Sequence, residues 1–247
     1  MPLRRLLLLP LLAAALLVAE AAWALLVGDE VPYTPPSMKP QRTGDPEDPA
    51  LSLVVLGDST AAGQGAPYER GIAVGAARTL AAQGRNVTWI NLAVSGAKWS
   101  DVRADQLRRA VELDADIVLI SAGSNDVTGG TSGGSLRGDI TAIVGALRAD
   151  DPAVRILVTG VPDMGSTPRL PQPLRWLAGE RAKSLNGVVR ATGATLDVVV
   201  IPIPERTGPV FRRDHSLFSV DRFHPDARGY AVWREVIDEA LEAAFPA

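Results

Sequence analysis

From residue 51 onward, short apolar runs rich in β-branched residues alternate with longer stretches whose apolar residues recur at helical spacing. The runs are apolar at successive positions, which is typical of strands buried on both faces of a parallel sheet. Parallel strands need crossovers, and the helical stretches between the runs supply them. We therefore expect one α/β domain over residues 51–247, a three-layer α/β/α sandwich with a five-stranded parallel sheet, its strands within 51–56, 87–92, 115–121, 154–160 and 197–203.

Composition excludes several classes of function. The 25 basic residues are scattered along the chain and the net charge is −3, so the sequence indicates no nucleic-acid partner. There are no cysteines, which rules out disulfides, thiolate nucleophiles and cysteine-held metals. With only two histidines, His215 and His224, a histidine-rich metal centre is not expected either. We predict no metal and no cofactor.

The N-terminus differs in character from the rest of the chain. Arg4 and Arg5 precede an apolar segment, residues 6–27, in which Glu20 is the only charged residue. A positive start followed by an apolar stretch is typical of an export signal, and 22 residues are enough to span a bilayer of about 30 Å. A buried or surface-lying helix of a cytosolic protein is the alternative, which the lack of a polar face disfavours.

Two outcomes of export stay open. Ala22-Trp23-Ala24 resembles the small-x-small pattern of a cleavage site, but residues 25–27 continue the hydrophobic stretch beyond it. Residues 1–27 are thus a signal peptide or an N-terminal membrane anchor, and we favour the anchor. A retained anchor would hold the protein on the outer face of the cytoplasmic membrane, with the arginines inside. A cleaved protein would be secreted.

Residues 28–50 form a proline-rich linker, because six of these 23 residues are proline. Prolines at this density prevent a helix and favour an extended, solvated chain. The segment is expected to tether the folded domain to the N-terminal helix.

Residues that could take part in catalysis lie after the predicted strands and near the C-terminus. Gly57-Asp58-Ser59 ends the first strand, Gly96 follows the second, Asn125 follows the third, and Asp221 and His224 lie near the C-terminus. In parallel α/β folds, ligands bind at the carboxyl ends of the strands. We expect these residues to meet at that edge.

A serine hydroxyl becomes a nucleophile when a base removes its proton, and a third group must orient that base. Asp221 lies three residues before His224 and can reach its Nδ1 atom, which leaves Nε2 free to face Ser59. The backbone N–H of Ser59, the unobstructed Gly96 and the side-chain amide of Asn125 can supply donors for an oxyanion. Asp58 is expected to stabilise the turn or the N-terminus of the following helix.

The ordered set Gly57-Asp58-Ser59, Gly96, Gly123-x-Asn125-Asp126 and Asp221-x-x-His224 resembles the SGNH, or GDSL, hydrolases. The resemblance covers residues 51 to about 245 and implies a flavodoxin-like α/β/α sandwich. It implies Ser59 as nucleophile, His224 as base and Asp221 as orienting acid, with an oxyanion hole of Ser59, Gly96 and Asn125. Thr60 stands where the older name of the family has leucine.

The resemblance also implies an ester hydrolase, without choosing among oxyesters, thioesters, lipid esters and sugar O-acetyl groups. Combined with export, it predicts a monomeric serine esterase or lipase whose substrate is a small-molecule, lipid or glycan acyl ester of the cell envelope. One alternative is an acyltransferase that moves an acyl group onto an envelope sugar. Another is a catalytically silent binding domain, against which the intact triad argues.

Three further positions carry expectations. His215 is expected in a loop outside the site, because no acid lies three residues before it. Asp126 is expected to be a structural hydrogen-bonding acid. Trp176 and Leu177 either line an acyl pocket or only pack their helix onto the sheet, and both interpretations stay open.

Overall fold

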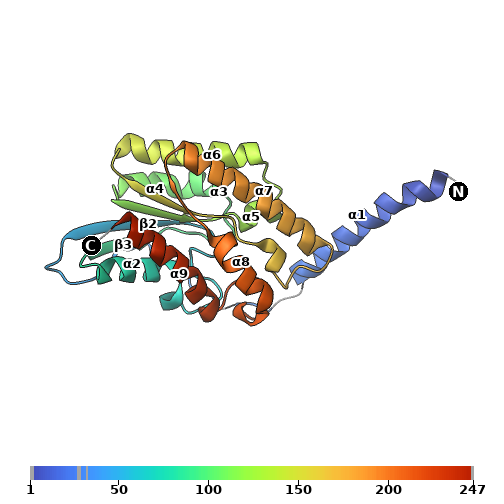
Figure 1. The fold of residues 1–247 in the computed structure, drawn as a ribbon, viewed down its shortest axis with the longest axis horizontal. Helices are drawn as coiled ribbons and strands as arrows, with labels where there is room; N and C mark the ends of the chain where they lie inside the picture. Colours follow the sequence, from blue (N-terminus) through green and yellow to red (C-terminus); the bar gives the residue numbers. More distant parts are fainter. Residues whose placement is uncertain (1–2, 27–28, 32, 246–247) are drawn as a thin grey trace.

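The computed structural model describes residues 3–26, 29–31 and 33–245, apart from the side chains of residues 3–11 and 25. Figure 1 shows a sheet between two layers of helices, with helix α1 (Leu3–Leu26) projecting from one end of the sandwich. The expected three-layer α/β/α architecture is confirmed.

In the described part of the chain, the sheet has six strands in the order β1-β3-β2-β4-β5-β6. Strands β2 to β6 are parallel to one another and correspond to the five predicted runs. The predicted number of five is wrong, because β1 adds an antiparallel edge strand beside β3. The strands are β1 (Gln41–Thr43), β2 (Ala50–Gly57), β3 (Asn86–Asn91), β4 (Ile117–Ser121), β5 (Arg155–Thr159) and β6 (Val199–Ile201).

Strand β1 comes from the proline-rich segment for which the sequence predicts a solvated tether. No proline lies between Pro40 and Pro46, so residues 41–43 keep the N–H groups that edge pairing needs. The indole N–H of Trp89 on β3 also donates to Thr43 Oγ1 at 3.0 Å. The end of the proline-rich segment is therefore attached to the sheet.

Helices cover both faces of the sheet. Helices α2, α8 and α9 pack on one face, while α3, α4, α6 and α7 pack on the other (Figure 1). The remaining helices are α2 (Ile72–Ala82), α3 (Trp99–Asp101), α4 (Leu107–Glu112), α5 (Ser124–Thr128), α6 (Gly133–Asp150), α7 (Leu174–Thr195), α8 (Ile203–Arg213) and α9 (Ala227–Ala244). Short helical turns are η1 (Tyr68–Arg70), the π-helical η2 (Val102–Gln106), η3 (Met164–Ser166) and η4 (His215–Leu217).

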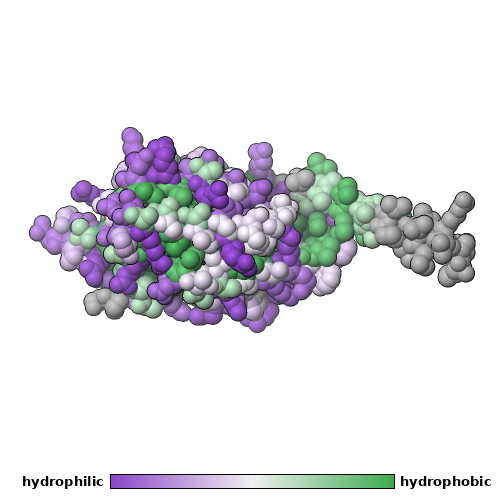
Figure 2. Space-filling view, turned by 90° about the horizontal axis from the view of Figure 1, so that it is seen from above, coloured by the Kyte–Doolittle hydropathy of each residue, from purple (hydrophilic) through white to green (hydrophobic). Residues whose placement is uncertain are grey.

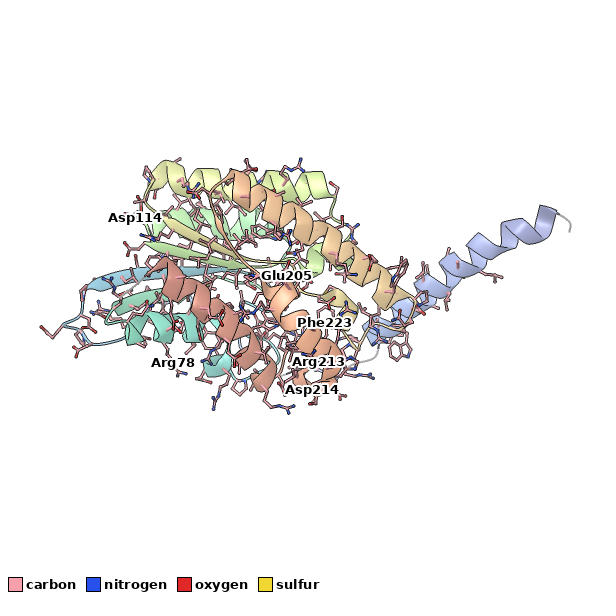
Figure 3. The ribbon with its side chains drawn as sticks, viewed as in Figure 1. Arg78, Asp114, Glu205, Arg213, Asp214 and Phe223 are labelled. Atoms are coloured by element: carbon pink, nitrogen blue, oxygen red, sulfur yellow. The ribbon has the colours of Figure 1, made fainter. Side chains whose placement is uncertain are left out.

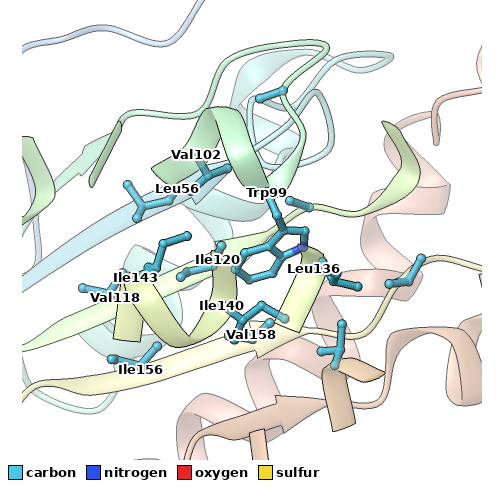
Figure 4. Packing of buried hydrophobic residues seen from close by; sticks show 14 of the residues in the cluster. Leu56, Trp99, Val102, Val118, Ile120, Leu136, Ile140, Ile143, Ile156 and Val158 are labelled. Carbon is cyan, nitrogen blue, oxygen red and sulfur yellow. The ribbon is translucent and has the colours of Figure 1, made fainter. Parts of the chain in front are cut away.

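Alternate residues of each central strand enter opposite cores. On β2, Val54 and Leu56 contribute to the core under α6 and α7, while Leu53 and Val55 contribute to the core under α2 and α9. Because both faces are buried, the strand is apolar at every position. Figure 4 shows the first core, with Trp99 among the aliphatic side chains of the sheet and of α6.

The sheet order places a topological switch at β2. From β2 the chain crosses to β3 on one side, and later to β4 on the other side. Gly57 at the end of β2 pairs with Ser121 at the end of β4. A crevice forms where strand order reverses, and in folds of this kind it is the usual place for a ligand.

Within the described residues, no helix is both long enough and apolar enough to cross a membrane. The side chains of Arg4 and Arg5, and of the first part of the apolar segment, lie outside those residues. The membrane anchor stays a prediction.

The core predicts a contrast between two tryptophans. Trp99 is fully buried in the α6 side of the core, whereas Trp176 on α7 is 58% exposed. Trp99→Ala should lower the free energy of unfolding by about 3–5 kcal/mol, because it leaves a cavity. Trp176→Ala should change it by less than about 0.5 kcal/mol. Chemical denaturation of both variants measures the difference, and equal losses would contradict the assigned core.

Candidate active site

Ser59 follows β2 on a turn that only glycine can begin. Gly57 has a φ of 139°, and a Cβ atom added there would lie 1.9 Å from the carbonyl oxygen of Ser121. The next residue, Asp58, donates its N–H to the same oxygen at 3.0 Å. The backbone therefore turns at the end of the strand, in the crevice beside β4, and presents Ser59 there.

A buried glutamine holds this turn from a distant part of the sequence. Gln106 Nε2 donates to the carbonyl oxygen of Gly57 at 2.9 Å, and Gln106 Oε1 accepts the N–H of Gly57 at 2.8 Å. No sequence motif marks Gln106, because its contact spans 49 residues. Burial of the side chain, visible only in the fold, is the signal that identifies it.

The structure brings Ser59, His224 and Asp221 together. His224 Nε2 lies 2.9 Å from Ser59 Oγ, and His224 Nδ1 lies 2.5 Å from Asp221 Oδ2. A carboxylate accepts hydrogen bonds only, which places the ring proton on Nδ1 and leaves Nε2 free to accept the serine proton. Asp221 Oδ1 accepts the backbone N–H groups of Phe223 and His224, each at 3.0 Å.

These contacts determine the charge of Asp221. Burial by itself raises the pKa of the carboxyl, but the hydrogen bond from His224, its positive charge and the two backbone N–H groups outweigh burial. The net result is a pKa below the ordinary value of 3.8. Asp221 is thus ionised at neutral pH and can both orient the imidazole and stabilise its protonated form.

The predicted oxyanion residues line the same cavity as Ser59 and His224. In the described part of the chain, the backbone N–H groups of Ser59 and Gly96 donate to no protein acceptor. Asn125 Nδ2 donates to the carbonyl oxygen of Ala97 at 3.0 Å, which occupies one of its two amide hydrogens. The second hydrogen remains for an oxygen in the cavity.

The cavity around Ser59 has a volume of about 540 Å³ and a largely apolar wall. Leu177 lines it, whereas the exposed Trp176 does not, so the two residues have different roles. Phe223, labelled in Figure 3 on the loop before α9, also contributes to the wall. The other apolar side chains come from helices α1, α5 and α7 and from the segment before α7: Ala21, Ala24, Val127, Leu170, Leu174 and Ala178.

Asp58 stabilises the turn, as its position predicts. Its Oδ1 atom accepts the N–H of Thr60 at 2.8 Å and the hydroxyl of Thr60 at 2.7 Å. Its Oδ2 atom is buried without a partner among the described residues. Burial raises the pKa of Asp58 to about 6, although the hydrogen bonds from Thr60 and the charge of His224 act in the opposite direction.

Asp126 and His215 lie outside the cavity, as expected. Asp126 is buried, its Oδ2 accepts the N–H of Trp99 at 3.2 Å, and burial raises its pKa. It therefore holds the start of α3 against α5, the helix that also carries Asn125. His215 is exposed at the start of η4. Among the described residues, no cluster of three or more histidine, aspartate or glutamate side chains could hold a metal ion.

Comparison with known proteins gives a consistent result. Residues 55–232 match the model of the GDSL-like lipase/acylhydrolase family. The chain is 34% identical over 204 residues to a GDSL-like esterase of Mycobacterium tuberculosis, an alignment that covers 79% of this chain and 63% of that protein. This chain thus spans less than two thirds of the length of that relative.

Solved structures share the fold at lower identity. A lipase/acylhydrolase from Enterococcus faecalis superposes with a TM-score of 0.64 at 20% identity, covering 78% of this chain and 96% of that one. A phospholipase A1 from Streptomyces albidoflavus superposes with a TM-score of 0.60 at 21% identity, covering 77% of this chain and 99% of that one.

The raised pKa of Asp58 predicts a pH dependence of stability. The folded carboxyl binds its proton more tightly than the unfolded one, whose pKa is near 3.8. Asp58 therefore contributes stability below about pH 4 that is lost as the pH rises through about 6. The free energy of unfolding of the wild type, relative to Asp58→Asn, should fall by about 2 kcal/mol between pH 4 and pH 6.

Denaturant unfolding across this pH range measures the difference between the two proteins. Other buried acids are present in both and cancel in the comparison. Asp150→Asn, at an exposed position on α6, controls for the loss of one charge. Parallel curves for the wild type and Asp58→Asn would contradict the raised pKa.

Proposed function

The chain belongs to the GDSL-like lipase/acylhydrolase family, and from that premise we propose that it is an exported serine esterase acting on lipid or cell-envelope acyl esters. The observation that carries the proposal is the hydrogen-bonded series of Ser59, His224 and Asp221 at the wall of an apolar cavity. This geometry meets the needs of nucleophilic acyl transfer.

The proposed reaction begins with attack of Ser59 Oγ on the ester carbonyl carbon. The serine proton passes to His224 Nε2, and the imidazolium keeps its hydrogen bond to Asp221. The carbonyl oxygen becomes an oxyanion that accepts hydrogen bonds from Ser59 N–H, Gly96 N–H and the Asn125 amide. Collapse of this intermediate breaks the ester C–O bond, and His224 gives the proton to the departing alcohol.

The acyl group then remains on Ser59 as an ester. Water attacks its carbonyl carbon while His224 Nε2 takes a proton from the water. The second tetrahedral intermediate collapses, the proton returns to Ser59 Oγ, and the carboxylic acid leaves. An acyltransferase would share the first half of this sequence and replace water by a sugar hydroxyl, so only the acceptor distinguishes the two reactions.

Substrate and location rest on two features. The cavity has a size in the usual range for ligand pockets, about 300–1,000 Å³, and its apolar wall suits an acyl chain. The positively charged start and apolar segment of residues 1–27 support export and a membrane-attached enzyme. Together these features favour acyl esters of the cell envelope over cytosolic thioesters.

Covalent labelling tests the nucleophile. A fluorophosphonate probe should label Ser59 in the wild type, and Ser59→Ala should abolish labelling and lower kcat on p-nitrophenyl esters by at least about a thousandfold. Ser95→Ala is a matched control, because Ser95 lines the same cavity but donates its hydroxyl to Gln64 Oε1 at 2.5 Å rather than to a histidine. That variant should keep the label on Ser59. Activity and labelling that persist in Ser59→Ala would overturn the proposal.

Adding sugar acceptors to the same assay separates hydrolysis from transfer. An esterase should release free carboxylic acid at an unchanged rate. Formation of an acylated sugar at the expense of the acid would replace the esterase proposal by the acyltransferase.

Kinetics of Asn125→Ala test the oxyanion hole. Asn125 is proposed to bind charge that develops in the transition state, so kcat should fall by roughly a hundred- to thousandfold with little change in KM. Because the side chain also donates to Ala97, a thermal melt must first show that the variant is folded. A stable variant with near wild-type kcat would contradict the oxyanion role.

A further inference from the structure

The last turns of α1 are packed onto the catalytic domain. Glu20 and Ala24 are each only 8% exposed, whereas Leu16 and Val18 on the same helix are 51% and 69% exposed. Figure 2 shows hydrophobic residues gathered where the projecting helix meets the domain. The end of α1 therefore behaves as part of the domain, while the preceding turns of the helix do not.

Glu20 caps the N-terminus of another helix. Its Oε2 atom accepts the backbone N–H of Leu174, the first residue of α7, at 2.9 Å. The residue before it, Pro173, makes no side-chain cap for this helix. A carboxylate at a helix N-terminus both satisfies an otherwise unpaired N–H and complements the helix dipole. Glu20, the only charge in the apolar segment, thereby acquires a specific partner.

Arg169 makes the reciprocal contact with the end of α1. Its Nε atom donates to the carbonyl oxygen of Ala24 at 2.6 Å. A cation near a helix C-terminus interacts favourably with the dipole and satisfies a terminal carbonyl. Arg169 also donates its backbone N–H to Arg222 at 3.0 Å, on the loop that holds Asp221 and His224. One arginine thus links α1 to the triad loop.

The docked turns border the substrate cavity. Ala21 and Ala24 line the same cavity as Ser59 and His224, together with Leu174 and Arg169. Their small side chains leave room beside the apolar wall of α7. Loss of these turns would open that side of the cavity to solvent.

We propose that residues 20–24 of α1 form a wall of the acyl pocket, held there by Glu20 and Arg169, so that the active enzyme retains α1 and prefers esters of long acyl chains. This inference rests on the proposed esterase function. It makes Glu20 and Arg169 specificity-determining residues that act through the position of α1. It also implies that the chain is not cleaved after Ala24, because cleavage there would remove the wall.

The full-length protein, purified in detergent, allows a direct test with p-nitrophenyl acetate and p-nitrophenyl dodecanoate. Glu20→Ala and Arg169→Ala should lower the ratio of kcat/KM for dodecanoate over acetate by about tenfold or more, which corresponds to lost contacts with about two methylene groups. The loss in kcat/KM should be larger for dodecanoate than for acetate, because the longer acyl chain makes more contacts with the apolar wall.

Further variants separate the wall from a general loss of folding. Glu20→Gln keeps an oxygen that can accept the N–H of Leu174 and should retain the wild-type ratio. Ala24→Leu places a larger side chain in the wall and should lower the ratio. Arg213→Ala, at an exposed position at the end of α8 (Figure 3), is the matched arginine control and should retain the ratio. An unchanged ratio in Glu20→Ala, Arg169→Ala and Ala24→Leu would overturn the proposal.

Hydrogen exchange gives a readout that does not depend on catalysis. The amide of Leu174 should exchange slowly in the wild type and in Glu20→Gln, and faster in Glu20→Ala. Fast exchange in the wild type would overturn the docking whatever the enzyme activity. The proposal would also be overturned if mass spectrometry of the mature protein isolated from membranes showed that residues 20–24 had been removed. If the wild type hydrolyses neither ester while its Leu174 amide is protected, the esterase function fails, and the proposed acyl specificity fails with it.

Discussion

The backbone of Gly57 is the point on which the geometry of the whole site depends. Its N–H and carbonyl are both held by Gln106, and the same carbonyl accepts the N–H of Val94 at 3.1 Å. The next N–H, from Asp58, reaches across to Ser121. Val94 lies two residues before Gly96, and Ser121 lies four residues before Asn125. One glycine therefore connects the three segments that carry Ser59, Gly96 and Asn125, and its positive φ is what lets those segments approach so closely.

The histidine reaches this site from the other end of the chain, and a second glycine makes that approach possible. A Cβ atom added at Gly65 would lie 2.8 Å from the Cβ of His224 and 2.5 Å from the carbonyl oxygen of Pro225. Beside it, the hydroxyl of the buried Tyr230 donates to the carbonyl oxygen of Gln64 at 2.7 Å. The loop after Ser59 and the start of α9 are thus packed against each other, which holds the imidazole at hydrogen-bonding distance from the serine.

How far the sequence predicts this structure depends on the range of the interactions. The five parallel strands follow from runs of apolar residues, and the meeting of Ser59 and Asn125 follows from strand ends sharing one edge. His224 follows no predicted strand directly, and its place in the site is predicted from the Asp221-x-x-His224 pattern. Strand β1 cannot be predicted from a run of apolar residues, because neighbouring prolines dominate the local pattern and its pairing partners lie on the distant strand β3. The contacts of Gln106 and Glu20 span 49 and 154 residues. Nothing local distinguishes Gln106 from other polar residues. Glu20 stands out as the only charge in its apolar segment, but the local sequence does not reveal the distant helix that it caps.

The two aspartates beside His224 show how burial alone does not determine charge. Both are almost inaccessible, yet the pKa of Asp221 is lowered while that of Asp58 is raised to about 6. Both oxygens of Asp221 accept hydrogen bonds, from the imidazole and from two backbone N–H groups. Asp58 has donors at one oxygen only, and its other oxygen is buried without a partner among the described residues. Hydrogen-bond donors compensate for the desolvation of a carboxylate, so Asp221, which has donors at both oxygens, keeps its charge at a lower pH than Asp58. The carboxylate of Asp221, beside Nδ1 of the histidine, therefore keeps its negative charge and can stabilise the imidazolium. Asp58 instead stabilises the turn that presents the serine.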